Sequence, residues 1–260
     1  MTLAAELRAT AFLARRSIVQ TFRYPRYLAP IVVFPSLFLA VNVGGAGRAT
    51  QIPEFPSVHG FLDFELAAAM LQSAMLCGVS SGMALGMDIE RGFIDRLMAS
   101  PVPRYLVVSG RLAATAALGV VIAVWFLTVG LVFGAHVEGG PLGVLVVVAV
   151  MALSAVAFGG LGAALALRSG SASAVQGTFP LVFVILFLST AFFPRELMQE
   201  PAQTIARWNP LSLLAEAVRD PIVSGAMLEP LLEGLAGVAI VGGVSASLSA
   251  LALRHRLRSG

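Results

Sequence analysis

The sequence has 260 residues with a net charge of +3, and 58% of them are hydrophobic while only 12% are charged. Average globular domains are about half apolar and a quarter charged, so this composition excludes an ordinary water-soluble domain and predicts an integral membrane protein. All 17 basic residues are arginine, and a Walker A loop needs a lysine, so any ATP must be bound by another polypeptide.

The first segment, residues 1–27, has the pattern of an amphipathic helix. Its apolar residues recur every three or four positions, at Leu7, Ala11, Ala14, Ile18 and Phe22. Arg8, Arg15 and Arg23 fall on other faces of the same helix. This spacing predicts an interface helix on the membrane surface, and a basic juxtamembrane anchor is the alternative.

Six apolar segments follow, each near the ~20 residues that cross a ~30 Å hydrocarbon core. They cover residues 28–44, 64–87, 112–135, 141–167, 174–193 and 235–253. The first contains Pro30 and Pro35, which predict a kink or a tilt. We therefore expect an all-α membrane protein with a six-span transmembrane domain over 28–253 and a short tail over 254–260.

The second apolar segment carries small residues at a regular spacing: Gly78, Gly82 and Gly86 lie four positions apart. This spacing lets helix backbones approach closely in lipid and predicts a packing face, either within the subunit or across a dimer. Polar residues at membrane depth face a translocation path or bond to neighbouring helices; they are Gln72, Ser73, Ser80, Ser81, Gln176, Thr178, Ser189 and Thr190.

The connection over residues 88–111 is short and densely charged. The residues that we single out in it are Glu90, Arg91, Gly92, Phe93, Asp95, Arg96, Leu97 and Pro101. Residues 93–99 can form two helical turns with one apolar side, which the following prolines end. The apolar side of such a helix fits a groove on a partner protein. From the residues alone, a solvated turn is an equally good prediction for this segment.

The connection over residues 194–234 alternates short apolar helical patterns with prolines. This alternation predicts small helices that lie in, or dip into, the outer leaflet. Its distinctive residues are Pro194, Asn209, Pro210, Glu216 and Arg219.

Arginine is unevenly distributed among the connections. With the N-terminus inside the cell, 13 of the 17 arginines lie in cytoplasmic parts. This asymmetry follows the positive-inside rule, and six spans then leave the N- and C-termini in the cytoplasm. It also accounts for the net positive charge, so we expect no nucleic-acid partner.

Both connections resemble those of one transporter family. The run E-R-G-x-x-D-R-L-x-A-S-P-V-P-R, which begins at Glu90, resembles the loop after the second helix in ABC type-2 exporter permeases. The later connection is similar to that family's signature: a proline after the fifth helix, N-P-L-S from Asn209, E-A-V-R from Glu216, and then Gly225. The proline at 201 departs from the pattern, in which a proline directly follows the methionine.

The resemblance is to the daunorubicin-resistance branch of this family and implies the permease subunit of an ATP-driven exporter in a bacterial plasma membrane. Two permease chains then pair, as a homodimer or a heterodimer, and each rests on a separate ABC ATP-binding subunit. That subunit holds ATP and Mg, this chain binds no cofactor, and membrane lipid is a further partner. Residues 90–100 become the cytoplasmic coupling helix, through which ATP-driven closure shifts the spans between two states.

The cargo implied by the resemblance is a hydrophobic drug or a lipid-like molecule, with export of polysaccharide or teichoic acid as the alternative. Ionisable residues are absent from the middle of the spans, which argues against an ion-coupled secondary transporter or channel. His59, His136 and His255 lie far apart in the sequence, so we expect no metal site. We find no set of catalytic residues and expect no enzyme.

Overall fold

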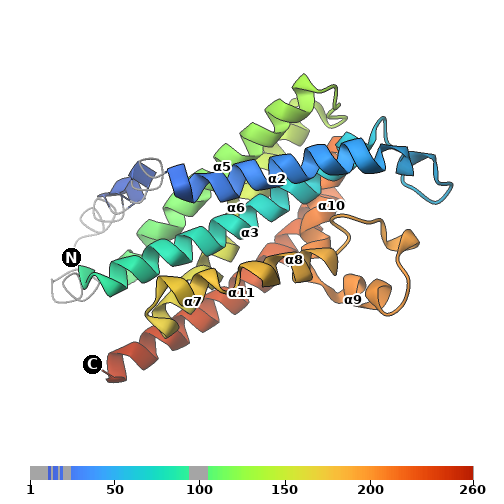
Figure 1. Ribbon diagram of the computed structural model, residues 1–260. Coiled ribbons are helices and arrows are strands. Elements are labelled where there is room, and N and C mark those ends of the chain that lie inside the picture. Colours follow the sequence, from blue (N-terminus) through green and yellow to red (C-terminus); the bar gives the residue numbers. More distant parts are fainter. Residues whose placement is uncertain (1–10, 13, 17, 20–24, 94–104, 260) are drawn as a thin grey trace.

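The computed structural model describes residues 11–259 apart from positions 13, 17, 20–24 and 94–104, and within these ranges the regular structure is entirely helical. Long helices pack side by side, and some of the shorter ones gather at one end (Figure 1). The helices long and apolar enough to cross a membrane belong to α2 (Pro25–Ala46), α3 (Phe61–Glu90), α5 (Tyr105–Val132), α6 (Gly140–Ser169) and α11 (Leu228–Ser259). The chain is therefore an all-α, multi-pass membrane protein.

The fifth apolar segment differs from the single helix predicted over 174–193. It consists of α7 (Ala172–Gln176) and α8 (Phe179–Phe187), after which the chain continues in turns. Gly177 and Thr178 separate the two helices, and Pro180 in the first turn of α8 cannot donate a backbone hydrogen bond to the preceding turn. The described part of the chain thus has five long helices and a broken, shorter segment.

The helices alternate in direction between two ends of the bundle (Figure 1). At one end, α2 begins, α3 ends, α5 begins and α6 and α11 end; we call it the Asp88 end. At the other lie η1 (Gly47–Gln51), η2 (Arg195–Leu197), α9 (Ala202–Trp208) and α10 (Pro210–Val223); we call it the Arg219 end. The α7–α8 segment leads from the Asp88 end toward the Arg219 end.

The central helix is α3, which contacts α2, α5, α6, α7, α8 and α10. About four-fifths of its most apolar stretch is buried, 78%, against 17% for α2 and 22% for α11. The outer faces of α2 and α11 are therefore left for lipid or for another chain.

Glycines set how closely α3 approaches its neighbours. A Cβ atom on Gly78 or Gly82 would lie 2.6 Å from the carbonyl oxygen of Phe158 or Gly162, respectively. At Gly86 it would lie 2.6 Å from the backbone nitrogen of Ala172. No side chain fits at these distances, so the glycines bring α3 directly against α6 and α7 within one chain.

The two connections are shorter than predicted, because the helices extend beyond the apolar segments. α3 continues to Glu90 and α5 begins at Tyr105, so the 88–111 connection narrows to 91–104. The 194–234 connection ends where α11 begins, at Leu228. Within it, α10 packs against α3, α6 and α11, and so enters the bundle instead of lying across its end.

Candidate functional site

A buried carboxylate joins three segments at the Asp88 end. Asp88 lies in the last turn of α3, and its side chain is only 3% exposed. Arg111 of α5 donates from Nη2 to Asp88 Oδ2 at 2.6 Å. Arg16, from the N-terminal segment, donates from Nη1 and Nη2 to Oδ2 and Oδ1 at 3.3 and 3.1 Å. We call these three residues the Asp88 cluster.

A buried charge is costly unless it is paired and hydrogen-bonded. Asp88 meets this condition, because both of its carboxylate oxygens accept hydrogen bonds from arginines. Arg111 also donates to the Ser81 carbonyl at 3.3 Å, and its side chain is 8% exposed. Arg16 is 38% exposed, and its guanidinium lies 4.0 Å above the ring of Phe93. One carboxylate therefore fixes the relative positions of the N-terminal segment, the end of α3 and the start of α5.

The end of α3 is also tied to the broken fifth segment. Glu90 Oε1 accepts a hydrogen bond from the backbone N–H of Ala172, the first residue of α7, at 2.8 Å. Gly92 then has φ +64, a left-handed conformation that favours glycine and turns the chain away from α3. Movement of this turn would act on both α3 and α7.

The structure describes only part of the coupling segment that the sequence predicts. Glu90 is the last residue of α3, and Arg91, Gly92 and Phe93 follow it directly. The other predicted coupling residues, Asp95, Arg96, Leu97 and Pro101, lie outside the described residues. Sequence reasoning missed Arg16, Asp88 and Arg111; opposite charges flanking the 88–111 connection were the available signal.

A second polar centre surrounds Arg219 of α10, which is 6% exposed. Its Nη2 donates to the carbonyls of Thr190 and Ala191 at 2.9 and 2.6 Å, and Nε donates to that of Phe64 at 3.4 Å. The guanidinium also lies 3.8 Å above the Phe64 ring. The first two carbonyls follow the end of α8 and lack helical partners, so Arg219 satisfies them.

The other predicted residues of this connection converge on the same turn after α8. The Asn209 amide donates to the carbonyls of Ile185 and Leu188 at 3.0 and 2.8 Å, and its Oδ1 caps α10 by accepting from Leu211 N at 3.0 Å. Glu216 Oε1 accepts from Thr190 Oγ1 and Arg195 Nη2.

The two prolines of this set lie at helix starts. Pro194 precedes η2, and Pro210 is the first residue of α10, where its missing N–H costs no helical hydrogen bond. The 194–234 residues thus hold α10 against the end of α8.

Burial lowers the pKa of Arg219 to about 10, while the nearby carboxylates of Glu216 and Asp220 act in the opposite direction. The guanidinium therefore remains charged at neutral pH. Glu65 of α3 is also buried near this end, and Asn42 donates to its Oε1 at 2.6 Å. The sequence analysis did not single out this carboxylate, because it lies close to the start of an apolar segment.

Two histidines that are distant in the sequence meet at the Arg219 end. The rings of His59 and His136 are 5.5 Å apart, and His59 Nδ1 lies 3.6 Å from Glu138 Oε1. In the part of the chain that the structure describes, no group of three or more possible ligands is arranged to hold a metal ion.

Comparison with known proteins places both polar centres within the range of one family model. The family model for the ABC-2 type transporter matches residues 8–223, a range that includes both polar centres. The daunorubicin resistance ABC transporter permease protein DrrB1 of Streptomyces coeruleorubidus is 29% identical over 240 residues. The alignment covers 91% of this chain and 80% of that protein.

Proposed function

This chain belongs to the ABC-2 type transporter family, and from that premise we propose that it couples ATP hydrolysis by a separate subunit to export across the membrane. As a permease subunit it carries no catalytic residues of its own. The observation that carries the proposal is the Asp88 cluster, which joins three segments beside the connection that resembles a coupling loop.

In the proposed mechanism, an ATP-binding subunit contacts residues 90–100 and pushes on them when it closes around ATP and Mg. Glu90, Arg91, Gly92 and Phe93 lead from α3 into this segment, and Asp95, Arg96, Leu97 and Pro101 lie within it. The Asp88 cluster passes the displacement to α5, and the Glu90–Ala172 hydrogen bond passes it to α7. Since α3 is the central helix, its movement reaches most of the bundle.

We further propose that two permease chains form the translocation path and that the Asp88 end faces the bacterial cytoplasm with both termini. The arginine asymmetry supports this orientation. A hydrophobic drug or lipid-like cargo is supported by the daunorubicin resistance for which the Streptomyces relative is named. Polysaccharide export remains the alternative cargo.

An ion-coupled transporter is the second candidate, because Glu65 is 1% exposed and its Oε2 has no hydrogen-bond partner among the described residues. Buried carboxylates of this kind serve ion pathways in such transporters. Glu65 lies only one turn from the start of α3, without a second ionisable group toward the Asp88 end of that helix until Asp88. ATP-driven export is therefore the better supported mechanism.

The test is reconstitution with an ABC ATP-binding subunit from the same organism. We expect co-purification and ATP-dependent transport of daunorubicin in proteoliposomes, abolished by an ATPase variant that binds but does not hydrolyse ATP. Reversing the charge of Asp95 or Arg96 should reduce transport and leave membrane insertion intact. Transport that persists without ATP and follows an ion gradient would favour the second candidate.

A further inference from the structure

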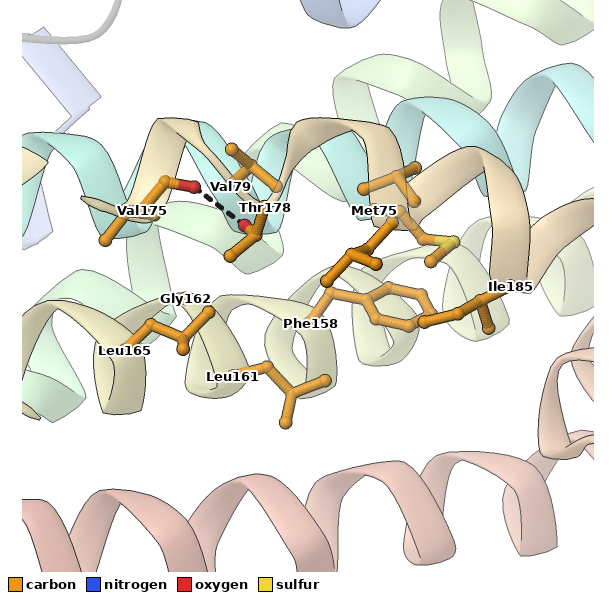
Figure 2. Close-up of a pocket in the computed structure, with 11 residues that line it drawn as sticks. Met75, Val79, Phe158, Leu161, Gly162, Leu165, Val175, Thr178 and Ile185 are labelled. Atoms are coloured by element: carbon orange, nitrogen blue, oxygen red, sulfur yellow. Dashed lines mark hydrogen bonds between the residues drawn. The ribbon is translucent and has the colours of Figure 1, made fainter. Parts of the chain in front are cut away.

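An apolar pocket of about 210 Å³ lies between α3, α6 and the α7–α8 segment (Figure 2). Its floor includes Met75, Phe158 and Val182, each at most 7% exposed. Its rim includes Leu165, Leu181 and Ile185, which are 41–55% exposed. The pocket therefore opens at the apolar surface of the bundle, where a membrane protein meets lipid.

The chemistry of the pocket restricts what it can hold. No charged side chain lines it among the described residues, and the hydroxyl of Thr178 is already donated to the Val175 carbonyl at 2.7 Å (Figure 2). Sites that enclose a whole drug-sized molecule measure ~300–1,000 Å³. A pocket of about 210 Å³ thus accommodates an uncharged, apolar part of a molecule, not all of it.

Two buried polar side chains lie one helical turn from the pocket. Gln72 precedes Met75 by three residues, and Ser154 precedes Phe158 by four, so each lies near the pocket-facing side of its helix. Both are fully buried. Within the described chain, neither the Gln72 amide nor the Ser154 hydroxyl has a hydrogen-bond partner.

The helix register places these two polar side chains at a similar height. Gly78 meets Phe158, and Gly82 meets Gly162 one turn further on. One turn in the other direction, the same register brings Ser154 to the level of Ala74, two residues from Gln72. Since α3 and α6 both run from the Arg219 end, this register places Gln72 and Ser154 at nearly the same level, on that side of the pocket.

We propose that the pocket and these two polar side chains form one cargo-binding site for an uncharged part of an amphipathic molecule. The pocket holds an aliphatic or aromatic segment, and Gln72 and Ser154 hydrogen-bond a hydroxyl or carbonyl group adjoining that segment. Leaving buried polar groups without partners costs free energy, which a ligand of this class recovers. This site rests on the proposed function only in that its ligand is the exporter's cargo. The apolar pocket disfavours polysaccharide as that cargo.

Photolabelling tests the site without requiring transport. The purified complex with its ATP-binding subunit, in nanodiscs without nucleotide, is irradiated with a long-chain primary alcohol that carries a mid-chain diazirine. Mass spectrometry should find saturable labelling of the pocket floor. The double variant Leu181→Trp, Ile185→Trp should block labelling, whereas Leu145→Trp, at a 64% exposed position on α6 outside the pocket, should not.

The polar side chains have their own test. In the double variant Gln72→Leu, Ser154→Ala, the alcohol should bind about tenfold more weakly, the usual scale of one well-placed hydrogen bond. A diazirine alkane of the same length should bind both forms equally. This variant removes unpartnered groups, so we expect it to fold, and a thermal melt checks that it does. Equal loss for both probes would overturn the polar role.

Three further outcomes separate this site from its rivals. If a diazirine phospholipid saturates the pocket and the alcohol does not displace it, the pocket is a lipid crevice and the inference fails. If the pocket stays unlabelled while the complex exports cargo, this inference fails and the proposed function stands. Saturable alcohol labelling in a complex without ATP-driven export would support the site and reject the function.

Discussion

At the scale of single residues, Asp88 is the group whose loss should cost most. Asp88→Asn leaves Arg111 buried without a counter-charge, and breaking a buried pair in this way costs about 3–5 kcal/mol. Arg16 is 38% exposed, so Arg16→Ala should cost about 1 kcal/mol or less. Chemical unfolding of the purified protein in detergent measures both values, and equal losses would contradict the difference in burial.

Replacing both buried partners separates stability from coupling. Asp88→Leu together with Arg111→Leu removes the two buried charges at once, a change that is often nearly neutral for stability. If the cluster transmits movement, ATP-driven transport by this variant should be lower than that of the parent protein, even though the two proteins are about equally stable to unfolding. Recovery of transport along with stability would assign the cluster a structural role only.

Asp220, one residue beyond Arg219, should make stability depend on pH. Burial raises its pKa from 3.8 to about 6; Arg219 opposes this rise, and the carboxylates of Glu216, Glu233 and Glu229 add to it. Between these two pH values the folded protein holds more protons than the unfolded chain, so stability falls as pH increases through this window.

The variant Asp220→Asn should remove that part of the pH dependence. Compared with the parent protein, it should gain stability progressively from about pH 4 to pH 6 and keep the gain above pH 7. Thermal unfolding at a series of pH values measures the difference, in which the contributions of other carboxylates cancel. A difference that does not change with pH would contradict the raised pKa.

At the scale of helices, the sequence predicts well those helices whose two ends are set by local hydrophobicity. The prediction over 141–167 differs from α6 (Gly140–Ser169) by two residues at most, since glycines and an arginine flank a uniform apolar run. The fifth segment was predicted less well. Its break lies just before Pro180, and its early end involves Asn209 and Arg219, which bond carbonyls there from a distant part of the chain.

Prediction of the candidate site is limited in the same way, because contacts between distant segments cannot be predicted from local sequence. The resemblance of the 90–104 run identifies the connection from local sequence alone, whereas the Asp88 cluster requires three segments to meet. Arg16 and Asp88 are 72 positions apart, and no spacing rule relates them. The same holds for the pocket, whose walls come from α3, α6, α7 and α8.

Close packing of α3 on α6 should make Gly82 intolerant of a side chain. In Gly82→Ala the new Cβ atom would lie 2.6 Å from the Gly162 carbonyl oxygen, and overpacking of this kind costs about 1–3 kcal/mol. Gly44 in α2 has nothing within 4 Å, so Gly44→Ala should be neutral or stabilising. Unfolding in detergent compares the two, and a tolerated Gly82→Ala would reject the tight α3–α6 contact.

At the scale of the whole molecule, the open question is whether the broken α7–α8 segment crosses the membrane. Its 16 residues fall short of the ~20 of a regular span. Ser169 ends α6 at the Asp88 end, and Thr204 lies in α9 at the Arg219 end, so these exposed residues bracket the segment. If the segment crosses, the two positions lie on opposite sides of the membrane.

Single-cysteine labelling answers this, because the natural Cys77 is fully buried and should react little. In intact cells, a membrane-impermeant maleimide should label Thr204→Cys at once and Ser169→Cys only after permeabilisation. Labelling of both from outside, or of neither, would mean that the segment turns back within the bilayer. The opposite pattern would place the Asp88 cluster outside the cell, where no ATP-binding subunit could act on it.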